Sequence, residues 1–218
     1  MRVDLHTHTT PASSCSQIDH ESFVNGCRVA GLTVVALTNH GDTADNLTLE
    51  PVLRGEGITL IHGVEISTLY GDFIIYSPDL EYLSRFRDIQ GVPKPSDIPD
   101  TAALVWVHPA AGGGRSGSSF FTGLATTVGP LIDGVEVYNG NWVADRYVQV
   151  ARDIARDYGI AATGGSDAHE ARHIGRCATE IPGTVNSTAD VVRAIRERAT
   201  SPLCQAKPAN RLRRFFGS

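Results

Sequence analysis

The 218-residue sequence predicts an α/β fold. Short runs rich in Val, Ile, Leu or aromatic residues alternate with helical stretches, and turn residues flank the runs. This alternation is typical of a largely parallel sheet with helices on the outside. Seven such runs fall within residues 2–165, which fits either a small barrel or an open doubly wound sheet. Periodicity does not separate these two architectures.

The predicted strands all have the composition of buried β-structure. In chain order they are 2–8, 33–38, 58–65, 72–76, 104–108, 134–138 and 160–165. Only six residues separate Glu65 from Asp72, which is too short for a helical crossover. These two strands are therefore predicted to be antiparallel.

The predicted helices lie between most of the strands. The clearest is 143–158, where apolar residues recur at helical spacing and Gly159 is a natural stop. Asp19 is expected to cap a helix that ends at Gly31, and Ser187 to cap another near the C-terminus. The stretches 79–90 and 119–127 are further candidates.

Composition places the chain among ordinary globular proteins. Hydrophobic residues make up 41% and charged residues 20%, which excludes a disordered, collagen-like or coiled-coil chain. No apolar run reaches about 18 residues, so we expect no membrane span. The N-terminus lacks the apolar core of a secretory signal, and the net charge of −5 disfavours a broad nucleic-acid surface.

Domain organisation and cysteine usage are simple. We expect a single domain over 1–218, with its motifs within 1–180 and a C-terminal helix and tail over 187–218. The four cysteines form no C-x-x-C pair, so zinc ribbons and thioredoxin motifs are excluded. No disulfide framework is expected, and the predicted setting is the reducing cytoplasm.

Five of the eight histidines sit at or just past the ends of predicted strands. Parallel α/β folds bring such positions together at one end of the sheet. His6-Thr7-His8 places two imidazoles on one face of a strand, with Asp4 on the same face, and two neutral imidazoles chelate a metal well. By itself, this motif also fits a polar strand end.

Four further segments add ligand-type residues. Asp167-Ala168-His169 follows a glycine-rich turn and repeats the i, i+2 geometry. Glu65 lies among apolar neighbours, so it needs either an ion-pair partner or a bridging role between two cations. His40 and His108 each follow an apolar run, whereas His62 faces away from Glu65 by strand parity and is interpreted as structural.

Together these segments resemble the metal-binding motifs of the polymerase and histidinol phosphatase (PHP) family. The similarity follows the family's order through Asp4-Leu5-His6-Thr7-His8, Thr38-Asn39-His40-Gly41, Gly63-Val64-Glu65-Ile66, Val107-His108-Pro109 and Gly165-Ser166-Asp167-Ala168-His169. The resemblance implies a distorted seven-stranded (β/α)7 barrel. It also implies phosphoester hydrolysis at a site of two or three zinc, manganese or iron ions.

The resemblance also assigns roles. It implies one metal held by His6, His8, Glu65 and Asp167, and a second that Glu65 shares with His108, with Asp72 as a further ligand. A third metal would take His40 and His169. Among these residues Glu65, Asp167 and His169 are the implied catalytic groups.

The chain departs from the family pattern at two positions. The stretch after His8 reads Pro11-Ala12-Ser13-Ser14-Cys15, without the His or Asp expected there, so a third metal would depend on Cys15 as a soft ligand. Asn39 stands where many members have Asp.

The predicted substrate is a small phosphorylated metabolite or a nucleotide. The arginines Arg115, Arg172 and Arg176 lie in loops after His108 and His169, and one of them could grip a phosphate. Glu136 and Asn139 end a strand and are expected behind the metals or at the substrate. The alternatives are a 3′–5′ exonuclease or short-oligonucleotide phosphodiesterase and a non-catalytic PHP-like binding module.

One motif favours a different class. Residues 112–117 match G-x-G-x-x-G, with Asp133 and Glu136 downstream, as in dinucleotide-binding oxidoreductases. However, His108, Pro109 and two alanines intervene before the first glycine, so the turn is not immediate, and the following segment is a poor helix. A loop over the metal site explains these glycines better.

Overall fold

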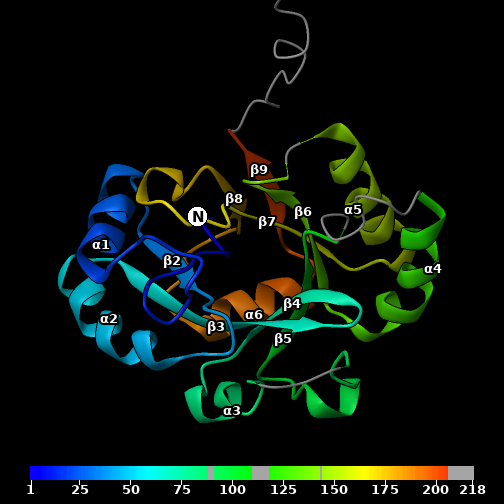
Figure 1. Cartoon of the computed structure of the whole chain (residues 1–218), viewed down its shortest axis with the longest axis horizontal. Coiled ribbons are helices and arrows are strands. Elements are labelled where there is room, and N and C mark those ends of the chain that lie inside the picture. Colours follow the sequence, from blue (N-terminus) through cyan, green and yellow to red (C-terminus); the bar gives the residue numbers. More distant parts are fainter. Residues whose placement is uncertain (88–90, 110–117, 143, 206–218) are drawn as a thin grey trace, which may run out of the picture.

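The core of the protein is a curled six-stranded sheet (Figure 1). The computed structural model describes residues 1–87, 91–109, 118–142 and 144–205. The strands, in spatial order, are β2 (Val34–Leu37), β3 (Thr59–Thr68), β4 (Gly71–Tyr76), β5 (Ala103–Val107), β6 (Gly134–Asn139) and β7 (Ala161–Gly165). The β3–β4 pair is antiparallel, as the short connection predicts, and β4–β5 is antiparallel as well.

The first strand is much shorter than predicted. Only β1 (Arg2–Val3) is regular, and it pairs with β8 (Cys177–Glu180), which pairs in turn with β9 (Ser201–Cys204). Residues 4–8 run between β2 and β7 through the isolated parallel bridges Asp4–Val35 and Thr7–Ala168. The seven-stranded barrel is therefore not confirmed, because the described ladder has six strands and this segment joins it only by bridges.

The first strand is interrupted next to a buried carboxylate that contacts distant backbone groups. The Asp4 carboxylate accepts hydrogen bonds from the backbone N–H groups of Ser166 (2.8 Å) and Gly175 (2.7 Å), and a longer one from His6 (3.3 Å). A buried side chain thus takes donors that a continuous ladder would pair with backbone carbonyls.

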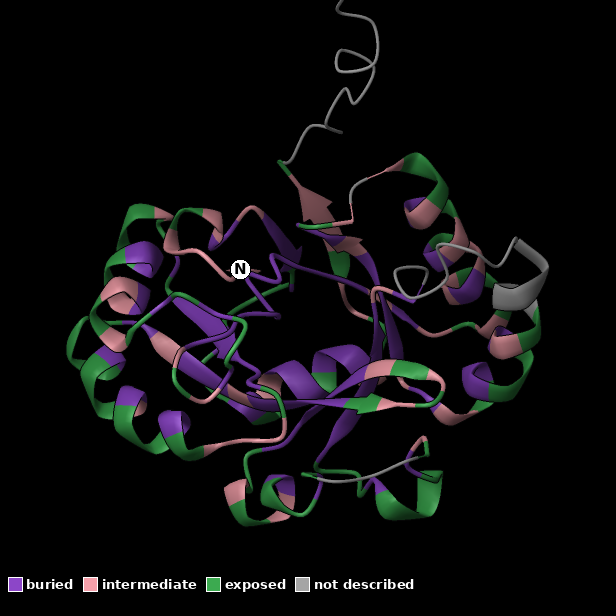
Figure 2. Cartoon of the chain, in the orientation of Figure 1, coloured by how far each residue is buried: buried purple, intermediate pink, exposed green. Residues whose placement is uncertain are grey.

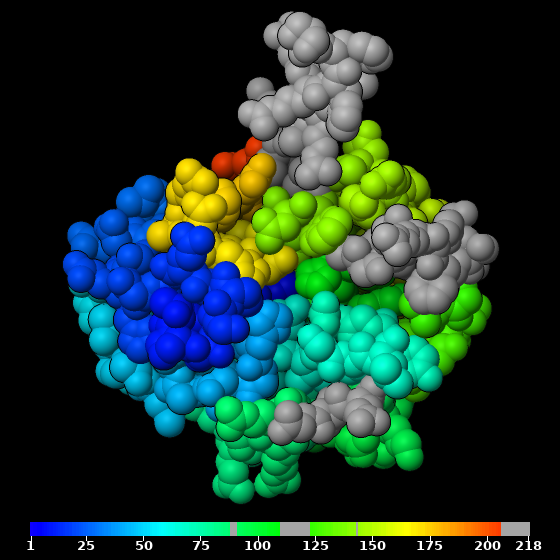
Figure 3. Space-filling view, viewed as in Figure 1, coloured from blue at the N-terminus to red at the C-terminus, as the bar shows by residue number. Residues whose placement is uncertain are grey.

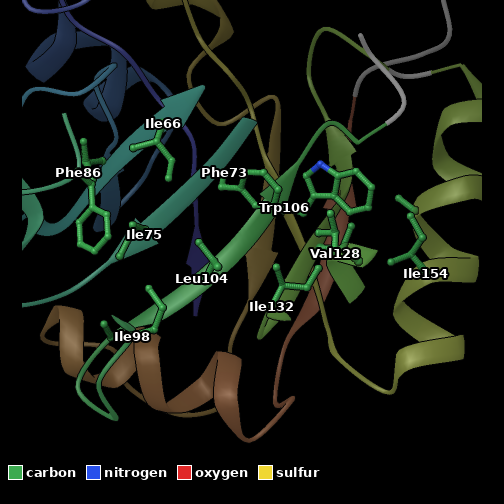
Figure 4. Packing of buried hydrophobic residues seen from close by; sticks show 14 of the residues in the cluster. Ile66, Phe73, Ile75, Phe86, Ile98, Leu104, Trp106, Val128, Ile132 and Ile154 are labelled. Atoms are coloured by element: carbon green, nitrogen blue, oxygen red, sulfur yellow. The ribbon is translucent and has the colours of Figure 1, made fainter. Parts of the chain in front are cut away.

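Helices cover the outer face of the curled sheet, and the strands between them are largely buried (Figure 2). Helices α1 (His20–Val29) and α2 (Ala44–Gly55) pack on β2 and β3, around Phe23, Leu37 and Leu53. The other side carries α3 (Leu80–Ser84), α4 (Ser118–Val128) and α5 (Asp145–Tyr158). There Trp106, Phe73 and Ile154 belong to one apolar cluster with the remaining residues of Figure 4.

A sixth helix fills the inside of the curl. Helix α6 (Thr188–Arg196) begins at the predicted cap Ser187, whose side chain accepts from the N–H of Asp190. It buries Val191, Val192 and Ile195 against inner-face residues of β2 to β5. The inner face of the sheet is apolar where α6 packs against it. The strand ends that carry polar residues lie away from this helix.

Three further features of the structure differ from what the sequence predicts. The predicted helix 143–158 begins at Asp145, and Val143 lies outside the described residues. Strands β8 and β9 were not predicted, because each has only four residues and β9 contains Pro202, which suits a sheet edge. Against expectation, Cys177 and Cys204 are opposite each other on these strands and form a disulfide.

The sequence predicts that no segment spans a membrane. Within the described residues, none of the helices combines the length and apolarity needed to cross a bilayer.

Candidate metal centre

Histidines and carboxylates from five separate segments of the chain meet at one place. His6 and His8 are fully buried between β2 and β7, Glu65 lies within β3, and Asp167 follows β7. In the space-filling view, the surface is hollowed where the N-terminal segment, the β3–β4 hairpin and the segment after β7 come together (Figure 3). The sequence-based expectation that these distant residues converge is met by the geometry.

The two imidazoles of the H-x-H motif share both carboxylates. His6 Nε2 lies 3.3 Å from Glu65 Oε2 and 3.6 Å from Asp167 Oδ1. His8 Nε2 lies 3.2 Å and 3.3 Å from the same two atoms. Four potential ligand atoms therefore face one small volume.

Glu65 is placed between two sets of histidines. Its Oε2 atom faces His6, His8 and the Nδ1 atom of His40, which is 3.3 Å away. Its Oε1 atom lies 3.3 Å from His108 Nε2. The two oxygens of one carboxylate thus point to different nitrogen donors, as a bridging ligand requires.

Three overlapping groups have the spacing of a cation site. In each group the potential ligand atoms lie within 4.8 Å of one another. The groups are His6–His8–Asp167, His6–Glu65–His108 and His8–His40–His169.

Residues behind the imidazoles orient their rings. Glu136 Oε1 lies 3.0 Å from His6 Nδ1, and because a carboxylate only accepts, His6 presents Nε2 to the cluster. Glu136 Oε2 also accepts the backbone N–H of His108 (3.0 Å). Asn139 donates to Glu136 (2.8 Å) and to Asp167 (3.3 Å), so both residues that the sequence expected near the site contact it.

Electrostatics keep the carboxylates of the cluster ionised. Burial alone would raise the pKa of Glu65, but the neighbouring His6, His108 and His8 hold it well below its usual range. Burial would likewise raise the pKa of Asp167, but the neighbouring His6 and His8 hold it below its usual range. Burial disfavours the charged form of His108. The neighbouring Glu65 has the larger, opposite effect and raises the pKa of His108 to about 9.

Two of these residues have unusual backbone conformations. His108 has φ +30° and Asp167 has φ +51°, a region that costs energy for residues other than glycine. Strain of this kind tends to be kept where a side chain must be aimed precisely.

The outer residues of the predicted set lie at the rim. The side chains of His40 and His169 are 42% and 29% exposed, and His169 Nε2 lies 3.1 Å from Cys15 Sγ. Asp72 Oδ2 lies 3.9 Å from His108 Nδ1, the ring nitrogen that does not face Glu65. Asp72 is absent from the three groups formed by the described residues.

The two predicted phosphate-binding arginines that the structure describes, Arg172 and Arg176, share no ion-pair or hydrogen-bond partner among the described residues. Arg172 forms an exposed ion pair with Glu170 (2.8 Å), and Arg176 lies four residues further on, after the turn at His173. Arg115 and the glycine motif 112–117 lie outside the described residues. Asp133 accepts from the N–H of Leu104 (2.8 Å), which is a structural contact.

Several polar residues beside the site were not predicted. Ser13 contacts the ring of His8, and Asp45 contacts Thr9 and Asn39 (2.7 and 3.4 Å). Nothing in the spacing of Ser13 or Asp45 indicates such a contact, because both belong to irregular or helical segments away from the motifs. His62, expected to be structural, lies 3.6 Å from Glu50, away from the cluster.

The donor set fits divalent cations. Three ligand atoms, His6 Nε2, His8 Nε2 and Glu65 Oε2, are buried and have no hydrogen-bond partner. Buried polar atoms are normally paired, so three unpaired ones facing each other indicate a position for an ion. Imidazole and carboxylate donors suit zinc, manganese or iron.

A family model matches the C-terminal part of the chain. The family is described as PHP-associated, and the match covers residues 146–200, from α5 to the residue before β9. The chain carries a PHP-associated region. This match supports the resemblance that the N-terminal motifs of the chain show to the PHP family.

Solved structures share the fold of this chain. PsfC from Pseudomonas syringae PB-5123 is 23% identical with a TM-score of 0.69, over 94% of this chain and 91% of that one. An amidohydrolase from Chromobacterium violaceum, with bound sulfate and no metal, is 16% identical with a TM-score of 0.64, over 94% and 99%.

A third structure and the curated proteins complete the comparison. A candidate metal-dependent phosphoesterase from Bifidobacterium adolescentis is 15% identical with a TM-score of 0.60, over 90% of this chain and 96% of that one. Among curated proteins, none matches this chain.

Proposed function

We propose that the protein is a metal-dependent hydrolase of phosphoesters, acting on a phosphomonoester of a small metabolite or nucleotide. The observation that carries the proposal is the cluster of buried, unpartnered ligand atoms of His6, His8 and Glu65 beside Asp167. The candidate metal-dependent phosphoesterase among the structural neighbours supports it, and the amidohydrolase supports the broader class of hydrolases.

The proposed ligands follow the three groups described above. His6, His8, Glu65 and Asp167 would hold one ion, and Glu65 with His108 a second, with Asp72 as its predicted outer ligand. His40 and His169 would hold a third, which Cys15 would complete. Bound divalent cations lower the pKa of water and neutralise charge on phosphoryl oxygens.

The residues of the chain have distinct roles in this proposal. Glu65 and Asp167 supply the negative charge that retains cations, and their pKa shifts keep that charge at neutral pH. Glu136 holds His6 in the orientation that presents Nε2. His169 lies at the exposed rim, where its side chain can reach a leaving group, and an arginine from the set Arg115, Arg172 and Arg176 would bind phosphate.

We propose a small substrate. The net charge of −5 favours a small anion held by cations over long nucleic acid. We further propose a single domain. The Cys177–Cys204 disulfide counts against the reducing cytoplasm expected from the sequence, because disulfides are rare there.

The test is turnover of defined substrates by the metal-loaded protein. We expect hydrolysis of p-nitrophenyl phosphate or a nucleotide with Mn²⁺, Zn²⁺ or Fe²⁺, and slower hydrolysis of bis(p-nitrophenyl) phosphate. Faster cleavage of short oligonucleotides would favour the exonuclease alternative. Bound metal with no turnover on any phosphoester would favour the binding module.

Ligand variants link turnover to the cluster. His8→Ala and Asp167→Ala are expected to lose metal and activity together. His62→Ala is the matched control, because His62 lies on the same strand as Glu65 but away from the cluster. Full activity in both ligand variants would contradict the assignment.

A further inference from the structure

A buried polar network lies behind His8, outside the proposed ligand set. Thr9, Ser13, Asn39 and Asp45 are each less than 10% exposed. Buried hydroxyl, amide and carboxylate groups need partners, so the direction of each hydrogen bond in the network can be followed.

The orientation of the Asn39 amide is fixed by its surroundings. Its Oδ1 atom accepts the backbone N–H of Thr9 (2.8 Å). Its Nδ2 atom donates to Thr9 Oγ1 (2.8 Å) and faces Asp45 Oδ2 (3.4 Å), which also accepts the Thr9 hydroxyl (2.7 Å). The amide oxygen therefore points toward Ser13, and the amide nitrogen points toward the carboxylate.

The direction of the Ser13 hydroxyl follows from the amide. Ser13 Oγ lies 2.9 Å from Asn39 Oδ1, an atom that only accepts, so Ser13 uses its single hydrogen there. Its lone pairs then receive the backbone N–H of His40 (3.1 Å) and face Nδ1 of His8 (3.3 Å). His8 Nδ1 must carry a hydrogen for this contact to be favourable.

We propose that Ser13 and Asn39 are positioning residues that hold His8 with its hydrogen on Nδ1 and its lone pair on Nε2. Asp45 anchors the amide that sets this direction. His8 Nε2 is the buried, unpartnered atom that faces Glu65 and Asp167. The inference rests on the proposed metal centre and adds to it residues that lie outside the proposed ligand set.

The network also explains why an amide stands at position 39. An aspartate there would place a second carboxylate oxygen about where Asn39 Nδ2 now faces Asp45 Oδ2, at 3.4 Å. Two carboxylates this close in a buried place repel each other. The amide N–H donor of Asn39 is therefore matched to the carboxylate acceptor of Asp45.

The first experiment uses zinc-loaded protein and the variant Ser13→Ala. Long-range ¹H–¹⁵N spectra of the imidazoles should show His8 protonated at Nδ1 and coordinated at Nε2 in the wild type. Ser13→Ala should weaken zinc binding about 10- to 100-fold in a chelator competition, as loss of an orienting partner does. Coordination of His8 through Nδ1 would overturn the proposal.

The matched control is Ser16→Ala. Ser16 is a buried serine of the same loop whose hydroxyl donates to the backbone carbonyl of His8 (3.0 Å) and not to its ring. It should keep wild-type zinc affinity. Equal affinities of Ser13→Ala and Ser16→Ala would overturn the proposal.

The second experiment exchanges donor and acceptor. Asn39→Asp should lower zinc affinity and the melting temperature, and Asn39→Asp with Asp45→Asn should recover most of both. A double variant no better than Asn39→Asp would count against the network. Failure of the proposed function would look different, because wild-type protein would then bind no zinc or show no phosphoester turnover.

Discussion

An imidazole binds a cation only through a free lone pair, so the group behind the ring decides what the ring can do. Glu136 acts behind His6, and the uncharged Ser13 lies behind His8. The two neighbouring histidines are therefore oriented by different chemistry. A carboxylate strengthens the donor that it contacts, whereas a hydroxyl mainly fixes its direction.

The free cysteines differ sharply in their expected reactivity. Cys15 is exposed beside His169, whereas Cys27 is buried; desolvation raises the pKa of both thiols, and that of Cys27 to about 12. Since the thiolate is the reactive form, N-ethylmaleimide should label Cys15 in the folded protein and Cys27 only after denaturation. Peptide mapping by mass spectrometry checks this. Equal labelling of both in the native state would contradict the burial of Cys27.

The sequence predicted the centre of the site better than its surroundings. His6, His8, Glu65, His108 and Asp167 could be recognised because each stands at a strand end within a short motif. Ser13 and Asp45 could not, because their contacts depend on how the loop after His8 folds against α2. The direction of Asn39 likewise follows from Thr9 and Asp45, which only the three-dimensional arrangement places beside it.

At the level of elements, β7 and the segment 4–8 approach more closely than a side chain allows. A Cβ added to Gly165 would lie 2.8 Å from His6 N and 2.9 Å from Glu136 Oε1. Gly165→Ala should therefore destabilise the fold by about 1–3 kcal/mol, as overpacking does, and weaken metal binding by moving His6. Urea unfolding and metal analysis measure the two effects.

Gly123 provides the comparison for this variant. It lies in α4, where an added Cβ meets nothing within 4 Å. Gly123→Ala should stabilise the protein by about 0.5–1 kcal/mol, because alanine favours a helix. Similar losses in both variants would show that the close approach at Gly165 has no special cost.

The β8–β9 disulfide should contribute to stability. Cys177 and Cys204 are 27 residues apart, and closing a loop of that size restricts the unfolded chain by about 3 kcal/mol. Cys204→Ser should lower the free energy of unfolding by a similar amount. Thiol titration of the denatured, unreduced protein should find two free thiols, and finding four would show that the bond does not form.

Strand prediction succeeded where composition is strongly apolar and failed at both ends of the chain. Residues 103–107 are all buried and were readily predicted as a strand. Strand β9 reads Ser-Pro-Leu-Cys, which lacks a strand signal and is held by its pairing with β8. Residues 4–8 looked like one continuous strand because nothing local reveals that Asp4 takes backbone donors from Ser166 and Gly175.

For the whole molecule, cation binding should be coupled to folding. The proposed ligands come from the N-terminal segment, β3, and the residues after β2, β5 and β7, so they assemble only in the folded state. A cation at 100 times its dissociation constant would add about 2.7 kcal/mol per site. In a protein of this size, each kcal/mol of added stability raises the melting temperature by about 2–4 °C. The melting temperature in zinc should therefore lie clearly above that in EDTA.

Calorimetry with and without the cation measures this coupling. Asp167→Ala should remove most of the increase, and His62→Ala should keep it. The same melting temperature in zinc and in EDTA would contradict a cation site made of residues from separate strands.

The pairing of β1 with β8 affects the order in which the protein can form during synthesis. His6 and His8 are made long before their neighbours, because this segment bridges to Ala168 after β7 and β1 pairs with residues 179 and 180. During synthesis, the imidazoles of His6 and His8 therefore lack these neighbours until residue 180 has been made. Only after translation has passed β8 can these histidines acquire their permanent neighbours.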